Sequence, residues 1–261
     1  ADKLRQKFYA STATALCGMN GRYIEMDYQE TQMYGDVMAM VKKQLNDFTL
    51  DVAIGGSIND RITNSTRIDS KNASLKYANV FNLANIVMSS SASIDQKIDA
   101  HYQLQSVFAT AQIGYKEGVF LDLTARNEWS STLAYTKYEK KGFFYPSVGV
   151  SFLPDKWVKM PEWVSFSKLR GAYSIVGNGV PPFITYPVSY VTAGGEILAS
   201  DAAPFAEMKP EMTHSVELGM EWKFLQHRLG LNLTYYRTDT YEQFFKLPAL
   251  AGDKYAYRYV N

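Results

Sequence analysis

The stretch that decides the fold is QSVFATAQIGYKEGVFLDLTARNEWSSTL, residues 105–133. Apolar and polar side chains alternate along 107–115 and again along 119–126, and the short segment 116–118, Lys-Glu-Gly, separates the two runs. Strands that bury one face show this period of two, and a tight turn with a glycine joins neighbouring antiparallel strands. The stretch therefore predicts a β-hairpin.

Four further segments alternate in the same way, with apolar residues recurring along 144–152, 169–175, 216–224 and 229–235. In the six predicted strands one set of positions, here called the apolar face, has no charged residue and includes Leu121, Val148, Leu218 and Leu231. The opposite set, here called the charged face, carries Asp122, Arg126, Lys168, Arg170, Glu217, Glu221 and Lys223. A soluble antiparallel sheet also has one face packed on the core and one face exposed to solvent, so this pattern alone fits a soluble sandwich as well as a membrane barrel.

The lengths of the connections favour the barrel. Short connections are predicted at 42–46, 116–118 and 225–228, an intermediate one at 153–167, and long ones at 57–105, 127–142 and 177–213. The two kinds alternate along the chain, which is typical of outer-membrane barrels with tight periplasmic turns and extended outer loops. We therefore expect Lys116 and Gly179 at opposite rims.

Composition agrees with a β-protein and excludes several other classes. The 261 residues include 19 Tyr, 14 Phe and 4 Trp, and 27 basic residues against 26 acidic ones leave a net charge of +1, which argues against a nucleic-acid binder. The single cysteine, Cys17, excludes an internal disulfide and a cysteine-rich zinc site. The segment 77–94 contains too many Asn and Ser residues for a membrane-spanning helix.

Aromatic residues gather at the ends of the predicted strands, where a barrel places its interfacial girdles. The set expected there is Tyr115, Phe143, Phe144, Phe152, Trp157, Trp163, Trp222, Phe224, Tyr235 and Tyr236.

No catalytic, cofactor or metal site emerges from the sequence. His101, His214 and His227 lack the spacing of metal ligands, and the Gly-rich stretch 176–182 has no Walker lysine. Glu217 and Glu221 are four residues apart on one strand face, about 13 Å, which is too far for a glycosidase pair. We expect a protein that is not an enzyme and that uses no cofactor.

Six segments resemble the SusC/RagA family of TonB-dependent outer-membrane transporters. Within the hairpin, residues 126–133 read RNEWSSTL, similar to the family's RNDWSSTL run with Glu128 in place of Asp. Further similar runs follow in family order at 143–152, 166–178, 209–219 and 228–236, and 79–85, NVFNLAN, is similar to a family loop motif upstream.

The resemblance implies an all-β fold in which this chain supplies about ten antiparallel strands of a 22-stranded transmembrane barrel. On this reading residues 1–261 are a partial barrel domain, without the plug, the TonB box and the C-terminal strands. The implied function is TonB-dependent import of oligosaccharides or peptides across the outer membrane of a Gram-negative bacterium. The implied partners are TonB, a SusD-like surface lipoprotein and outer-membrane lipid, and nucleic acid is not among them.

Two other functions stay open at this point. A soluble β-rich carbohydrate-binding module would use exposed Tyr and Trp as stacking platforms, but it leaves the alternation of connection lengths unexplained. A barrel enzyme would need a Ser/His/Asp-type set near a strand end, which three scattered histidines do not offer.

The segment from Gly177 to Thr213 is the expected contact region for a partner or solute. Its prolines and glycines exclude a continuous strand or helix. Yet it has too many apolar side chains to leave in water, so these must pack against a surface. That surface is either the rim of the barrel itself or a partner. The candidate contact residues are Phe183, Tyr186, Tyr190 and Phe205.

Overall fold

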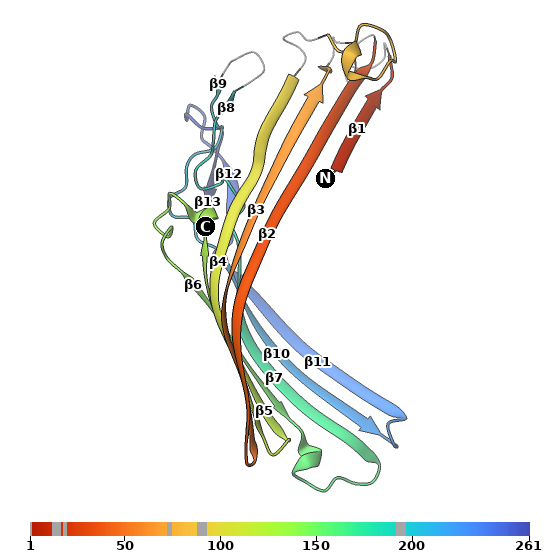
Figure 1. The fold of residues 1–261 in the computed structure, drawn as a ribbon, viewed down its shortest axis with the longest axis vertical. Helices are drawn as coiled ribbons and strands as arrows, with labels where there is room; N and C mark the ends of the chain where they lie inside the picture. Colours follow the sequence, from red (N-terminus) through yellow and green to blue (C-terminus); the bar gives the residue numbers. More distant parts are fainter. Residues whose placement is uncertain (1, 12–16, 18–19, 72–74, 88–92, 192–196) are drawn as a thin grey trace.

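The computed structural model describes residues 2–11, 17, 20–71, 75–87, 93–191 and 197–261. Within these residues the chain forms one nine-stranded antiparallel sheet in the order β1-β2-β3-β4-β5-β6-β7-β10-β11. Apart from two small hairpins in the loops, each strand pairs with the one before it in this meander (Figure 1). No helix among the described residues is long and apolar enough to span a bilayer. The all-β, antiparallel prediction is confirmed.

The strands differ greatly in length. β2 (Arg22–Leu45), β3 (Phe48–Asp69) and β4 (Ser93–Tyr115) have 24, 22 and 23 residues, while β5 (Val119–Ser130) and β6 (Phe143–Phe152) have 12 and 10. The remaining strands of the sheet are intermediate or short: β1 (Asp2–Phe8), β7 (Val164–Asn178), β10 (Glu211–Phe224) and β11 (Leu229–Tyr241). At about 3.3 Å per residue, β2 to β4 are over 70 Å long, roughly twice what a tilted membrane strand needs.

Short and long connections lie at opposite ends of the sheet (Figure 1). The tight turns β2–β3, β4–β5 and β10–β11, together with the β6–β7 connection, form what we call the turn end. The long connections 70–92, 131–142 and 179–210 form the loop end. Lys116 and Gly179 are therefore at opposite rims, as predicted.

The predicted loops were too long, above all the one at 57–105. β3 continues to Asp69 and β4 begins at Ser93, so most of that segment is strand. Beyond the apolar band these strands are polar on both faces, with Asp60 paired to Gln103 on one face and Asn59 paired to Leu104 on the other. Without apolar alternation, the sequence has no period-two signal there.

Two short hairpins lie outside the main sheet, at the loop end. β8 (Tyr190–Val191) pairs with β9 (Ile197–Leu198), and β12 (Phe245–Pro248) pairs with β13 (Tyr257–Val260). The 3-10 turns η2 (Leu83–Asn85) and η3 (Ser131–Leu133) also lie in the loop-end connections, while η4 (Pro154–Lys156) lies at the turn end.

Candidate functional site

Cross-strand register places the predicted charged set on one face of the sheet. Directly paired residues of antiparallel strands point to the same side. Asp122 pairs with Gly149, which pairs with Ala172, and that row continues to Glu217. The next rows bring Arg170 beside Gly219 and Lys168 beside Glu221. The seven predicted residues thus share one face, while the apolar face is opposite.

Most of the charged side chains on this face have polar partners. Arg170 reaches Glu217 at 3.1 Å and donates to Thr234 Oγ1 at 2.8 Å, two strands away. Gln112 Nε2 donates to Asp122 Oδ1 at 2.7 Å, and Lys223 lies 3.4 Å from Glu221. The side chains of the ion-paired residues on β7 and β10 are 34–46% exposed, so this part of the charged face is hydrated and carries charges of both signs.

The same face contains an acidic residue that the sequence analysis missed. Glu128 contacts Arg126 two residues earlier on β5, and both pair with the first residues of β6. It was placed in the predicted loop 127–142, whereas β5 continues to Ser130. The signal was present, because Glu128 continues the period-two pattern of Asp122, Thr124 and Arg126.

Arg170 can cross to Thr234 because a glycine lies between them. Gly219 is the direct partner of Arg170 on one side and of Thr234 on the other, and a Cβ at Gly219 would come within 2.9 Å of Arg170 Cγ. We expect Gly219→Val to displace the guanidinium and to lower the free energy of unfolding by about 1–3 kcal/mol. Denaturant unfolding of the full-length protein in lipid vesicles measures this.

The matched control for that substitution is Gly230→Val. Gly230 is on the same face, and no atom lies within 4 Å of a Cβ built there. It should therefore change stability far less than Gly219→Val. Equal losses for both variants would contradict the role given to Gly219.

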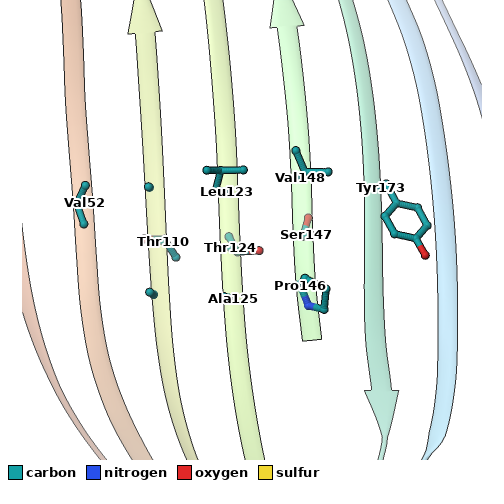
Figure 2. Close-up of a pocket in the computed structure, with 11 residues that line it drawn as sticks. Val52, Thr110, Leu123, Thr124, Ala125, Pro146, Ser147, Val148 and Tyr173 are labelled. Atoms are coloured by element: carbon teal, nitrogen blue, oxygen red, sulfur yellow. The ribbon is translucent and has the colours of Figure 1, made fainter. Parts of the chain in front are cut away.

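The apolar face is hollowed at its centre (Figure 2). A cavity of about 340 Å³ lies where small side chains, among them Ala109, Ala111 and Ala125, sit between Val52 and Tyr173. Leu123, Pro146 and Val148 complete the apolar lining, and the other lining residues are Thr110, Thr124 and Ser147. No charged side chain lines it, which matches a surface that meets hydrocarbon.

An aromatic belt follows the apolar face at the turn end. Phe48 and Tyr115 rings are 4.7 Å apart, Tyr115 and Trp157 are 5.5 Å apart, and Trp163 and Phe224 are 5.7 Å apart. Trp222 stacks on Phe224 at 6.2 Å. Two of the predicted belt residues are wrong: the register puts Phe143 and Tyr236 on the charged face, opposite Glu128 and Glu217.

The second aromatic level lies at the other edge of the apolar band, at Trp129 and Phe144. Trp129 is ten residues beyond Val119, the direct partner of the belt residue Tyr115. At about 3.3 Å per residue and a strand tilt near 40°, the two aromatic levels are about 25 Å apart along the membrane normal. The apolar band of an outer-membrane barrel has about this height.

At the loop end, the connections fold onto one another around a small core, here called the loop-end core. Leu133, Val180 and Met208 are fully buried, with Phe143, Phe205 and Tyr259 packed around them. Thr185 Oγ1 donates to the carbonyls of Thr132 and Ala134 at 3.2 and 3.1 Å, which ties two connections together. Burial raises the pKa of Tyr259 at the edge of this core, and the neighbouring Tyr257 adds to the shift.

The four predicted contact residues have different surroundings. Phe205 packs into the loop-end core, and Phe183 is half-buried with a backbone φ of 63°. Tyr186 is 53% exposed, and its ring lies 4.7 Å from that of Tyr135, itself 69% exposed. The side chain of Tyr190 lies outside the described residues. Phe205 is thus covered by the loop-end core, whereas the Tyr186–Tyr135 pair is exposed.

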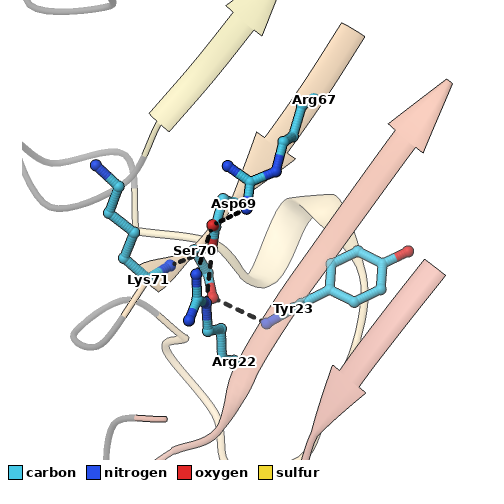
Figure 3. Close-up of polar contacts among 6 residues, drawn as sticks. All are labelled: Arg22, Tyr23, Arg67, Asp69, Ser70 and Lys71. Carbon is cyan, nitrogen blue, oxygen red and sulfur yellow. Dashed lines mark hydrogen bonds and ion pairs between the residues drawn. The ribbon is translucent and has the colours of Figure 1, made fainter. Parts of the chain in front are cut away.

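The far tip of the long strands is held by a buried carboxylate, the Asp69 clamp (Figure 3). The Asp69 side chain is 1% exposed and accepts from Arg22 Nε and Nη2 at 2.9 and 2.7 Å, from Arg67 Nη2 at 2.6 Å and from the Lys71 amide at 2.9 Å. Next to it, Ser70 Oγ accepts from the Tyr23 amide at 2.9 Å. The clamp joins the start of β2 to the end of β3.

The loop motif at 79–85 packs beside this tip. Asn85 is buried, and its side-chain amide accepts from the Tyr77 amide and donates to the carbonyls of Tyr77 and Val80. Phe81 packs with Tyr23, Leu75 and Ile86. The motif is therefore an internally satisfied loop that covers the strand tips.

The described residues contain no group of three or more His, Cys, Asp or Glu side chains that could hold a metal ion. Of the predicted histidines, His101 lies 3.5 Å from Asp60, His227 is in the β10–β11 turn, and His214 is on the apolar face beside Tyr173.

Comparison by sequence decides the family. The family described as "TonB dependent receptor-like, beta-barrel" matches residues 3–261. The chain belongs to this TonB-dependent receptor-like barrel family. No curated protein matches the chain by sequence.

Solved structures agree with this TonB-dependent receptor-like fold. The chain superposes on the structure titled "Structure of the RagAB peptide transporter" with a TM-score of 0.78 and 17% identity, covering 98% of this chain and 29% of that one. The RagAB peptide importer in the "open-open" state gives 0.75 and 17%, covering 98% and 28%. The FpvAI–pyocin S2 complex gives 0.52 and 12%, covering 92% and 30%. The chain spans less than a third of the solved chains it matches, and the fold agrees with the SusC/RagA resemblance in the sequence.

Proposed function

We propose that this chain forms part of the wall of a TonB-dependent importer in the outer membrane of a Gram-negative bacterium. The observation that carries the proposal is the two-faced band, with an apolar face of membrane height bounded by aromatic belts and a charged face behind it. In a wide barrel such a charged face lines the lumen. On this assignment Asp122, Arg126, Lys168, Arg170, Glu217, Glu221 and Lys223 face the plug or the solute path.

The open edges of the sheet support a larger barrel. Within the apolar band the edge strands are β2 and β11, because β1 pairs only with residues 22–28 of β2, which lie beyond the band. Both edges would leave backbone groups unpaired in hydrocarbon, which a membrane does not tolerate. We infer that further strands close the barrel to about 22 and that a plug and a TonB-contacting segment belong to the same protein. Residues 1–261 are then one part of the barrel domain.

Peptides are the proposed solute, because the solved RagAB structures with this fold are titled as a peptide transporter or importer. A SusD-like surface lipoprotein is the proposed partner, and the exposed Tyr186–Tyr135 pair at the loop end is the proposed contact. Transport assigns no chemical step to these residues, so the proposal is a carrier and not an enzyme. Oligosaccharides remain the competing solute.

The experiment is uptake by cells that carry or lack the full-length gene. A fluorescent peptide mixture and a fluorescent oligosaccharide mixture are supplied separately, with and without a functional TonB. We expect peptide uptake to require both the gene and TonB. Uptake of oligosaccharide alone would reassign the solute, and uptake unaffected by loss of the gene would reject the importer.

A pair of adjacent substitutions tests which face lines the solute path. Ser147 is on the charged face opposite Thr124, and Val148 is on the apolar face at the central hollow. We expect Ser147→Trp to lower peptide uptake because its ring projects into the solute path, and Val148→Trp to leave uptake nearly unchanged because its ring enters lipid. Cell-surface labelling confirms equal amounts of both variants. The reverse order of effects would show that the faces are assigned the wrong way round.

A further inference from the structure

In the part of the sheet from β5 to β11, the apolar face carries one charged cluster, at the loop end of β7, β10 and β11. On this face β5, β6, β7 and β10 have no Asp, Glu, Lys or Arg, and β11 has two such residues, Arg237 and Asp239. Asp239 is the direct partner of His214, and Arg237 is the direct partner of Val216, whose other partner is Tyr173. With Tyr241 these residues form what we call the interface cluster: Tyr173, His214, Arg237, Asp239 and Tyr241.

The contacts within the interface cluster orient its hydrogen-bonding groups. Tyr173 Oη lies 2.8 Å from His214 Nδ1, and the His214 ring is edge-on to Tyr241 at 5.0 Å. Arg237 donates from Nε to Asp239 Oδ2 at 3.0 Å and from Nη2 to Asp239 Oδ1 at 3.3 Å. When the tyrosine hydroxyl donates to Nδ1, the imidazole proton is on Nε2, which is left as a donor.

The cluster is open to the surroundings of the sheet. Tyr173, which lies on β7 between two paired strands, is 39% exposed. The side chains offer donors on Arg237 and His214 and acceptors on Asp239 and Tyr173, beside the flat ring of Tyr241. A ligand that matches them has both phosphate-type acceptors and hydroxyl or amide donors.

The height of the cluster identifies what it meets. His214 is ten residues from Phe224, the belt residue at the turn end of the same strand, which is about 25 Å along the membrane normal at a tilt near 40°. This is the same level as Trp129 on β5. On the orientation proposed above, that level is where headgroups of the outer leaflet lie, and in a Gram-negative outer membrane those headgroups are phosphorylated glycolipids.

We propose that the interface cluster is a binding site for the phosphorylated sugar headgroup of an outer-leaflet glycolipid. Arg237 and the Nε2–H of His214 bind phosphate oxygens, Asp239 accepts from sugar hydroxyl or amide groups, and Tyr241 covers one face of the sugar. The apolar residues below the cluster, Val216, Leu218, Leu233 and Tyr235, contact the acyl chains. The proposal rests on the orientation of the barrel given under the proposed function.

The first test measures binding of glycolipid to the full-length protein in nanodiscs. The probes are diphosphorylated lipid A, its dephosphorylated form and phosphatidylglycerol. We expect the diphosphorylated form to bind most tightly, and the double variant His214→Ala/Arg237→Ala to lose about tenfold or more of that affinity, since charge-assisted hydrogen bonds are lost. Tyr173→Phe, a milder variant that removes only the hydroxyl, should weaken binding less. Lys116→Ala, in the turn-end belt, is the matched control and should not change it.

The second test separates the site from the barrel orientation. A photo-crosslinking amino acid is placed at Tyr235, on the apolar face, or at its neighbour Tyr236, on the charged face. We expect glycolipid to crosslink to position 235 alone, and capture to fall in the double variant. Capture at 235 that the double variant leaves unchanged would overturn the headgroup site while keeping the orientation. Capture of glycolipid at position 236 alone would overturn the orientation of the barrel, and with it the proposal that this chain forms part of an importer. Capture of a protein instead of lipid at position 235 would overturn the glycolipid as the ligand.

Discussion

Replacing Asp69 with alanine is expected to cost about 3–5 kcal/mol of the local stability of the strand tips. The carboxylate is 1% exposed and holds two arginines, Arg22 and Arg67, whose side chains are 21% and 34% exposed. Without it, two positive charges face one another and lose the carboxylate that they share. The backbone amide of Lys71 also loses its acceptor.

Hydrogen exchange at the loop end measures this effect. In the full-length protein, amides around Tyr23 and Ser70 should lose protection in Asp69→Ala, while amides at the turn end, such as Gly118, keep theirs. Glu30→Ala is the matched control, because Glu30 pairs with Arg61 in the same hairpin but both side chains are about 40% exposed. That exposed pair should contribute at most about 1 kcal/mol. Equal loss of protection in both variants would contradict a special role for the clamp.

The clamp also predicts how the tip responds to pH. Burial by itself would raise the pKa of Asp69, but hydrogen bonds from Arg22 and the Lys71 amide, with the charges of Arg22 and Arg67, lower it overall. A carboxyl whose pKa is lower in the folded state adds stability above its unfolded value, near 3.9, and that stability is lost as the pH falls through the folded value. Protection near Tyr23 should therefore be constant from pH 7 to about 5 and fall below about pH 4.

The central part of the fold was predictable because its two faces differ. Along 105–133 the alternation, the Lys-Glu-Gly turn and the register agree, so local pattern and sheet pairing give the same strands. The seven charged residues were found for the same reason. The distal halves of β2 to β4 were missed, because side chains that meet water on both faces leave no period in the sequence.

Other features depend on contacts between residues far apart in the chain. Arg22 and Asp69 are 47 residues apart, and nothing local marks them as partners. Gly219 resembles any strand glycine until Arg170 is seen to cross it. The interface cluster was missed because the apolar pattern of β11 ends at Tyr235, and Arg237 and Asp239 then looked like residues of a loop.

Leu121→Arg tests the assignment of the apolar face most directly. Leu121 pairs with Ile113 and Val150. It lies three residues on the turn-end side of residue 124, the middle of the band between Val119 and Trp129 on β5, and its side chain meets hydrocarbon on the proposed orientation. Arginine there should lower the free energy of unfolding in lipid by about 1–3 kcal/mol, because the guanidinium enters hydrocarbon between the midplane, where the cost is about 2–4 kcal/mol, and the interface, where it is about 0–1 kcal/mol. Thr124→Arg, three residues along the same strand, puts the same side chain on the charged face between Thr110 and Ser147, where water and carboxylates are near. It should change the unfolding free energy by less than about 1 kcal/mol.

Urea unfolding of the full-length protein in phospholipid vesicles, followed by tryptophan fluorescence, compares the two. A larger loss for Thr124→Arg than for Leu121→Arg would mean that the charged face meets lipid, and the membrane orientation of the whole sheet would then be wrong.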